Sequence, residues 1–124
     1  MTTPIRIAQV AAGGYGQQYL KALLDNTDPE SYVFAGVVDP FADRCDRIDE
    51  LRSSGIPVFA GLEEFYHQQD ADLVIIASPI HLHREQTEEA LRHGSHVLCE
   101  KPLGAAIQEA RSMVRAREQA NRWV

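Results

Sequence analysis

Short apolar runs alternate with longer amphipathic segments along this chain, and the alternation limits its possible folds more than any other sequence feature. The runs at residues 5–10, 32–38 and 73–77 are rich in β-branched residues and have the length of strands. Shorter runs at 57–59 and 96–99 complete a set of five predicted strands. The main runs are almost continuously apolar, as expected for strands that are covered by helices on both faces.

Segments with helical spacing of apolar residues follow the runs. They lie at residues 15–25, 41–51, 62–69, 81–93 and 107–120. In the second of them, Phe41, Cys45, Ile48 and Leu51 are expected to share the apolar face. The alternation predicts an α/β fold: a doubly wound, Rossmann-like parallel sheet with helices on both faces. No repeat or linker marks a second domain, so residues 1–124 are interpreted as one domain.

Charge and cysteine content narrow the partners and the compartment. The chain has 12 Lys and Arg against 18 Asp and Glu, a net charge of −6, which disfavours nucleic acid and anionic membranes as partners. The longest apolar run, 73–77, is far shorter than the roughly 20 residues that cross a bilayer. The N-terminal residues do not have the pattern of a secretory signal. The two cysteines, Cys45 and Cys99, form no disulfide framework, so we expect a cytoplasmic protein.

A glycine-rich segment, Ala11-Ala12-Gly13-Gly14-Tyr15-Gly16, joins the first predicted strand to the first helix. Its position and spacing match the dinucleotide-binding fingerprint, except that Ala11 replaces the first glycine. Gly13 lets the backbone approach a pyrophosphate, Gly16 lets the helix pack closely, and the helix N-terminus attracts phosphate. If position 11 requires a positive φ, alanine costs on the order of 1 kcal/mol there. We interpret Ala12 through Gly16 as cofactor-binding; the alternative is a turn that only connects two elements.

Asp39 comes at the end of the second predicted strand. In a nucleotide-binding sheet, an acidic side chain here accepts hydrogen bonds from the adenosine ribose and repels a 2′-phosphate. NAD is therefore the expected cofactor, ahead of NADP. Alternatively, Asp39 caps the turn before Pro40, and Arg44 is near enough in sequence to reach a 2′-phosphate.

Two further polar segments follow predicted strands, at the edge where open α/β sheets bind ligands. They are Ser78-Pro79-Ile80-His81-Leu82-His83 and Glu100-Lys101-Pro102-Leu103. Together with the glycine segment and Asp39, they resemble the Gfo/Idh/MocA oxidoreductase family, and the resemblance covers essentially the whole chain. It implies the Rossmann half of an NAD(P)-dependent sugar or polyol dehydrogenase.

The resemblance also implies roles for individual residues. Lys101 is expected to be catalytic, reaching the substrate hydroxyl and the nicotinamide region. Glu100 and Pro102 are expected to shape the part of the site around Lys101. Ser78, Pro79, His83, Glu100 and Lys101 are expected to contact the cofactor. The family commonly has Asn where this chain has Ile80, which removes a polar group near the cofactor. A surface lysine after a strand is the alternative reading of Lys101.

The histidines do not form a predicted metal site. His93, His96 and Cys99 have donor atoms suited to zinc, but His96 and Cys99 point to opposite faces of a strand. His81 and His83 likewise diverge on a helix, so they are expected to lie near the nucleotide or to cap their helix.

Two functional hypotheses from different classes follow. The first is the NAD-binding domain of a hydride-transfer enzyme that acts on a sugar-like alcohol, and the second is a non-catalytic NAD-binding module or partner subunit. A structural remnant without a ligand is a third. Family enzymes resemble two-domain proteins whose second domain supplies substrate contacts, and that domain is expected to be absent, which leaves open whether the chain alone is an enzyme. An uncovered sheet edge is expected to favour a homo-oligomer.

Overall fold

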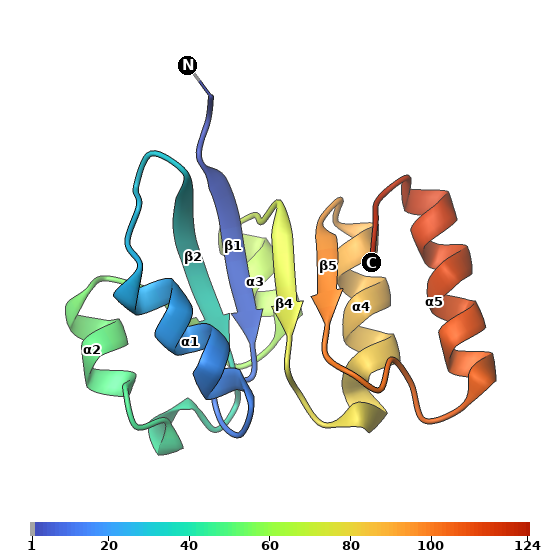
Figure 1. The fold of residues 1–124 in the computed structure, drawn as a ribbon, viewed down its shortest axis with the longest axis horizontal. Coiled ribbons are helices and arrows are strands. Elements are labelled where there is room, and N and C mark those ends of the chain that lie inside the picture. The colour runs from blue at the N-terminus through green and yellow to red at the C-terminus, as the bar shows by residue number, and fades with distance from the viewer. Residues whose placement is uncertain (1) are drawn as a thin grey trace.

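The computed structural model describes residues 2–124, which form one parallel sheet with helices on both of its faces (Figure 1). The strands are β1 (Ile5–Val10), β2 (Tyr32–Val38), β3 (Val58–Phe59), β4 (Leu73–Ile76) and β5 (His96–Cys99). The helices are α1 (Gly16–Asp25), α2 (Ile48–Ser53), α3 (Leu62–Gln68), α4 (His83–Arg92) and α5 (Ile107–Ala120). The strand order is β3-β2-β1-β4-β5. The predicted doubly wound, five-stranded parallel fold is confirmed.

The register of the sheet brings the carboxyl ends of its strands into line. Val10 at the end of β1 pairs with Val38 on one side and with Ile76 on the other, and Ile76 pairs with Cys99. The segments that follow β1, β2, β4 and β5 therefore leave the sheet side by side. Candidate residues far apart in the sequence meet at one edge for this reason.

Two apolar cores cover the two faces of the sheet. One core contains Leu20 of α1 and Leu51 of α2, packed over Val37. The other contains Phe65 of α3 and Leu91 of α4, with side chains of α5 packed against it. Each β-strand alternates its side chains between faces, so both faces of the central strands are apolar. This arrangement explains the near-continuous apolar runs in the sequence.

The expected helix at 41–51 is only partly correct. A 3₁₀ turn occupies Ala42–Arg44, Cys45 is extended at φ −74° and ψ 130°, and α2 begins at Ile48. The break lets Ala42 and Cys45 both face the core, while Phe41 remains 61% exposed beneath the guanidinium of Arg44. The expected place of Phe41 on the apolar face is therefore wrong, because Ala42 is buried instead. Apolar spacing alone does not distinguish a continuous helix from a broken one that still buries Cys45, Ile48 and Leu51. A 3₁₀ turn at Ile80–Leu82 likewise precedes α4, which begins two residues later than expected.

Candidate functional site

The glycine-rich loop after β1 has the tight backbone that its sequence predicts. Ala11 has a φ of 71° and Gly14 a φ of 54°, both in the left-handed region. A Cβ atom on Gly16 would lie 2.3 Å from the carbonyl oxygen of Ala11, so only glycine allows α1 to start this close to the strand. Position 11 therefore does require a positive φ, and alanine tolerates it at a cost of about 1 kcal/mol.

The outer side of this loop is open and rich in donors. A Cβ added to Gly13 or Gly14 would meet no atom within 4 Å. Among the residues described, the backbone N–H groups of Gly13, Gly14 and Tyr15 have no hydrogen-bond acceptor. The first turn of α1 carries no acidic side chain. Free N–H groups at the positive end of a helix dipole are suited to phosphate.

Gln9 supports the loop from inside the protein, and sequence analysis did not identify it. Its side chain is fully buried, and Nε2 donates to the carbonyl oxygens of Ala11 and Gly16 at 3.0 and 2.7 Å. These bonds join the two ends of the loop. The available signal was a polar residue within an otherwise apolar predicted strand, since such a side chain must find a partner when it is buried.

Asp39 links the end of β2 to the loop after β1. Its Oδ2 accepts the backbone N–H of Ala12 at 3.0 Å, and its Oδ1 accepts that of Phe41 at 2.8 Å. The turn-capping alternative is thus realised in the structure. Each carboxylate oxygen has a second lone pair, so the same side chain can still accept hydrogen bonds from the hydroxyl groups of a ligand.

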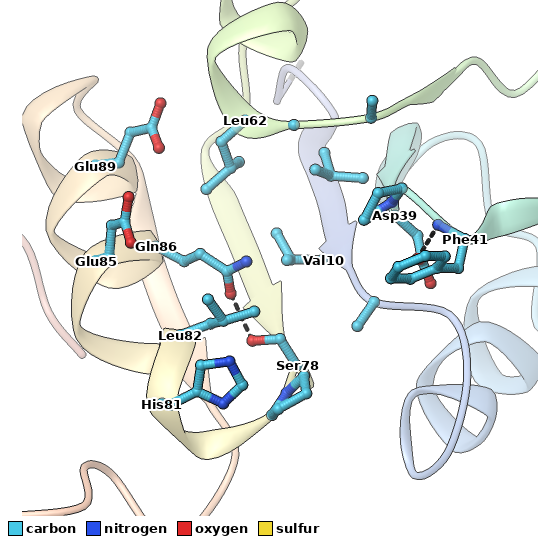
Figure 2. Close-up of a pocket in the computed structure, with 16 residues that line it drawn as sticks. Val10, Asp39, Phe41, Leu62, Ser78, His81, Leu82, Glu85, Gln86 and Glu89 are labelled. Carbon is cyan, nitrogen blue, oxygen red and sulfur yellow. Dashed lines mark hydrogen bonds between the residues drawn. The ribbon is translucent and has the colours of Figure 1, made fainter.

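A cavity of about 420 Å³ opens beside Asp39 (Figure 2). Asp39 and Phe41 stand on one side, and side chains of the β4–α4 segment stand on the other. Within the β4–α4 segment, the hydroxyl of Ser78 donates a hydrogen bond to Oε1 of Gln86 at 2.5 Å. Apolar side chains, with Val10 and Leu62 among them, line the interior, and Glu85 and Glu89 make its α4 side acidic.

A second hollow, of about 430 Å³, adjoins the first on the side of the glycine loop. Asp39, Phe41 and Ser78 border both spaces, and Gly13 and Gly14 border only the second. Together they form a trough that runs from the apolar cavity to the free N–H groups of the loop. Pro79 lies along this trough, as expected for a ligand contact.

The two histidines after β4 occupy different environments. His81 lines the 420 Å³ cavity. His83 is only 2% exposed, and its ring lies between two carbonyl oxygens, with Nδ1 2.9 Å from Pro102 O and Nε2 2.8 Å from Ser78 O. The expected cofactor contact from His83 does not fit this geometry, because neither ring nitrogen is free to face the trough. Sequence spacing did not distinguish the two rings, since both lie near the start of the same helix.

Lys101 projects from an ordered corner at the end of β5. The residue is exposed, whereas Glu100 beside it is half-buried and accepts the backbone N–H of Lys101 at 3.2 Å. The other oxygen of Glu100 accepts the hydroxyl of Tyr19 of α1 at 2.5 Å. This hydrogen bond to a carboxylate is the main cause that raises the pKa of Tyr19 to about 12.

Residues 2–124 contain no cluster of three metal-ligating side chains. His93 stacks on Tyr66, and His96 stacks on Trp123. None of the helices in residues 2–124 has both the length and the apolar character needed to span a bilayer.

Comparison with known proteins identifies the family. Residues 5–124 match the Gfo/Idh/MocA model, described as an oxidoreductase family with an NAD-binding Rossmann fold. An uncharacterized oxidoreductase of Streptococcus pneumoniae is 31% identical over 117 residues, which cover 94% of this chain and 30% of that protein. The scyllo-inositol 2-dehydrogenase (NADP(+)) IolU of Bacillus subtilis is 30% identical over 112 residues, or 90% of this chain and 33% of its own.

The fold comparison agrees with the sequence comparison. The WlbA dehydrogenase of Chromobacterium violaceum, solved in complex with NADH and UDP-GlcNAcA, is 28% identical and superposes with a TM-score of 0.82 over 99% of this chain. The match covers 35% of that structure, and the chain spans about a third of the length of the curated relatives above. The chain belongs to the Gfo/Idh/MocA oxidoreductase family, and its fold is the NAD-binding Rossmann domain of that family.

Proposed function

We propose that this chain is the cofactor-binding part of an oxidoreductase that prefers NAD and transfers hydride between the nicotinamide and a sugar- or polyol-like alcohol. One observation carries the proposal: the glycine loop, Asp39, Ser78 and Lys101 all leave the same edge of the sheet in register. Parallel sheets bind ligands at this edge, where the strand order reverses. Here the reversal lies between β1 and β4.

The trough offers separate environments for the adenosine and the pyrophosphate of the dinucleotide. The free N–H groups of Gly13, Gly14 and Tyr15 would hold the pyrophosphate. The apolar 420 Å³ cavity suits a planar base, and the carboxylates of Glu85 and Glu89 on its α4 side disfavour phosphate there. The charge distribution thus supports an orientation with the adenosine in the cavity and the phosphates at the loop.

Asp39 supports a preference for NAD. Its carboxylate stands between the cavity and the loop, where the adenosine ribose would lie, and its unused lone pairs can accept ribose hydroxyls. A 2′-phosphate placed there would meet a like charge at short range. Arg44 also borders the trough, but its guanidinium lies over the ring of Phe41, 5.0 Å from the centroid.

The nicotinamide, when bound, supplies the hydride acceptor for oxidation of an alcohol. The chain's own contribution is the ammonium of Lys101, an exposed cation at the end of β5. An ammonium there would donate a hydrogen bond to the substrate oxygen and stabilise negative charge as the hydroxyl proton leaves. Substrate contacts from outside this chain would fix the alcohol carbon over the ring, since orientation accounts for much of the rate.

Calorimetric titration with NAD, NADH and NADP tests the binding proposal. We expect measurable heats of binding with NAD and NADH, and a lower affinity for NADP. A folded sample that binds none of the three would refute the proposed function. Turnover with a panel of polyols then tests whether this chain is active by itself: NAD reduction that is lost in Lys101→Met indicates an enzyme. Binding without turnover indicates either a nucleotide-binding module or a part of an enzyme that needs substrate contacts from outside this chain.

Self-association and a cytoplasmic location are further parts of this proposal. Leu98 on edge strand β5 is 42% exposed and Val114 on α5 is 47% exposed, and both border an apolar hollow of about 250 Å³. A second copy of the chain would bury this surface. Light scattering at high concentration should show a species larger than the monomer, and Val114→Glu should restore the monomer. Cys45 and Cys99 are free thiols, which supports a reducing compartment that cell fractionation can test.

A further inference from the structure

We infer that Tyr19 and His83 are positioning residues that hold Lys101 from its two sides. The hydroxyl of Tyr19 donates to the carboxylate of Glu100, the residue before Lys101, and Nδ1 of His83 lies 2.9 Å from the carbonyl oxygen of Pro102, the residue after it. Sequence position alone did not predict a positioning role for either side chain. The inference rests on the proposed function, because it concerns how Lys101 is presented to the nicotinamide.

The bond from Tyr19 couples the corner to the nucleotide-binding helix. Tyr19 lies one turn into α1, beyond the close contact at Gly16. Its hydroxyl donates to one oxygen of Glu100, and the other oxygen of Glu100 accepts the N–H of Lys101. A displacement of α1 relative to the end of β5 would therefore shift the backbone of Lys101.

The bond from His83 couples the corner to the wall of the cavity. The buried ring lies between the carbonyl oxygens of Pro102 and Ser78, each within hydrogen-bond distance of one nitrogen. A hydrogen on either nitrogen therefore joins α4 to one of the two segments. Ser78 itself borders the trough, so His83 relates the position of Lys101 to the ligand-binding surface.

Tyr19 reaches the backbone N–H of Lys101 through the carboxylate of Glu100, and His83 lies against the backbone carbonyl of Pro102. Neither contact involves the ammonium of Lys101. A lysine side chain is long and flexible, so the region that its ammonium samples depends on where the Cα atom is held. Contacts on Glu100 and Pro102, the residues before and after Lys101, fix the position of that Cα atom. If they serve Lys101, their loss should impair interactions at the nicotinamide and spare those at the adenosine and the pyrophosphate.

Binding of NADH and of ADP-ribose, which lacks the nicotinamide, provides the test. The variants are Tyr19→Phe, which removes one hydroxyl, His83→Gln, which replaces the rigid ring between two carbonyl oxygens with a flexible amide, and Lys101→Met as the reference. We expect Tyr19→Phe to weaken the binding of NADH about three- to tenfold, which is the loss typical of one hydrogen bond. The affinity for ADP-ribose should stay unchanged within about twofold. His83→Gln should show the same selectivity. Tyr32→Phe is the matched control, because the Tyr32 hydroxyl bonds the carbonyls of Leu23 and Asn26 away from the trough.

A double-mutant cycle shows whether Tyr19 acts through Lys101. Tyr19→Phe should weaken NADH no further once Lys101 is Met. Additive losses, equal losses for NADH and ADP-ribose, or unchanged NADH affinity in folded Tyr19→Phe and His83→Gln would each overturn the inference. Failure of the unmodified chain to bind NADH would instead refute the proposed function, so the two failures are distinguishable.

Discussion

The carboxylate of Asp39 accepts the backbone N–H of Ala12 at a distance of 3.0 Å, so the end of β2 is bonded directly to the loop after β1. The same carboxylate also accepts the N–H of Phe41. One side chain thus organises two backbone segments that border the trough, while keeping a negative charge where a ribose would lie. Its structural role and its proposed binding role are compatible, and they predict separable effects.

Asp39→Asn should narrow the preference for NAD over NADP by about tenfold, because the like-charge repulsion of a 2′-phosphate is removed. Stability should fall by about 1–2 kcal/mol, since the amide can accept only one of the two N–H groups. The ratio of the dissociation constants of NAD and NADP, measured by calorimetry, reports the selectivity and is not affected by losses that both cofactors share.

Asp72→Asn is the matched control for this change. The Asp72 carboxylate accepts the backbone N–H of Arg6 near the start of β1, at the amino ends of the strands and therefore away from the proposed binding site. Its replacement should leave the NAD-to-NADP ratio unaltered. An unaltered ratio in Asp39→Asn as well would show that Asp39 does not select the cofactor.

Ala11→Gly should stabilise the protein by about 1 kcal/mol, equivalent to a rise in Tm of about 4 °C. Ala11 has a φ of 71°, which is unfavourable for alanine and accessible to glycine. Thermal unfolding followed by circular dichroism measures the change. A lower Tm would mean that glycine's extra freedom in the unfolded chain outweighs the relief of strain.

Gly16→Ala should reduce stability, whereas Gly13→Ala should reduce cofactor binding and leave stability unchanged. A Cβ on Gly16 would lie 2.3 Å from the carbonyl oxygen of Ala11, so Gly16→Ala should cost about 2 kcal/mol or more. A Cβ on Gly13 would contact nothing within 4 Å, so Gly13→Ala should fold normally. It should nevertheless weaken the binding of NADH about tenfold, because the added methyl group occupies the space through which the pyrophosphate approaches the backbone. Normal NADH affinity in Gly13→Ala would place the phosphates elsewhere.

Stability should decrease between about pH 10 and about pH 12. The hydrogen bond to Glu100, followed by burial, raises the pKa of Tyr19 to about 12, and burial raises the pKa of Tyr66 to about 12. An unfolded tyrosine loses its proton near pH 10, so alkaline solution favours the unfolded chain until the native phenols also ionise. Urea unfolding across this pH range should give a shallower decline for the double variant Tyr19→Phe/Tyr66→Phe. A decline identical to that of the unmodified protein would contradict these assignments.

Much of the fold could be predicted because it depends on local patterns. The β-branched runs predicted β1, β2 and β4 closely, and the glycine spacing predicted the tight turn before α1. The segment around Cys45 was harder to predict, because a continuous helix and a broken one both bury Cys45, Ile48 and Leu51. The position of Asp39 was also predictable, and its bond to the N–H of Phe41 matches the turn-capping alternative to its ribose role, whereas its bond to the N–H of Ala12 was not predicted.

The sequence by itself determined the strand–helix alternation, the glycine loop and the placement of polar residues after strands, because each depends on neighbouring positions in the chain. Only the tertiary structure decided which side chains meet at the edge of the sheet. Tyr19 reaches Glu100 across 81 positions of sequence, and His83 reaches Pro102 across 19. Such bonds depend on how α1 and α4 pack against the ends of β4 and β5, and the hydrophobic packing that sets those distances involves residues along the whole chain.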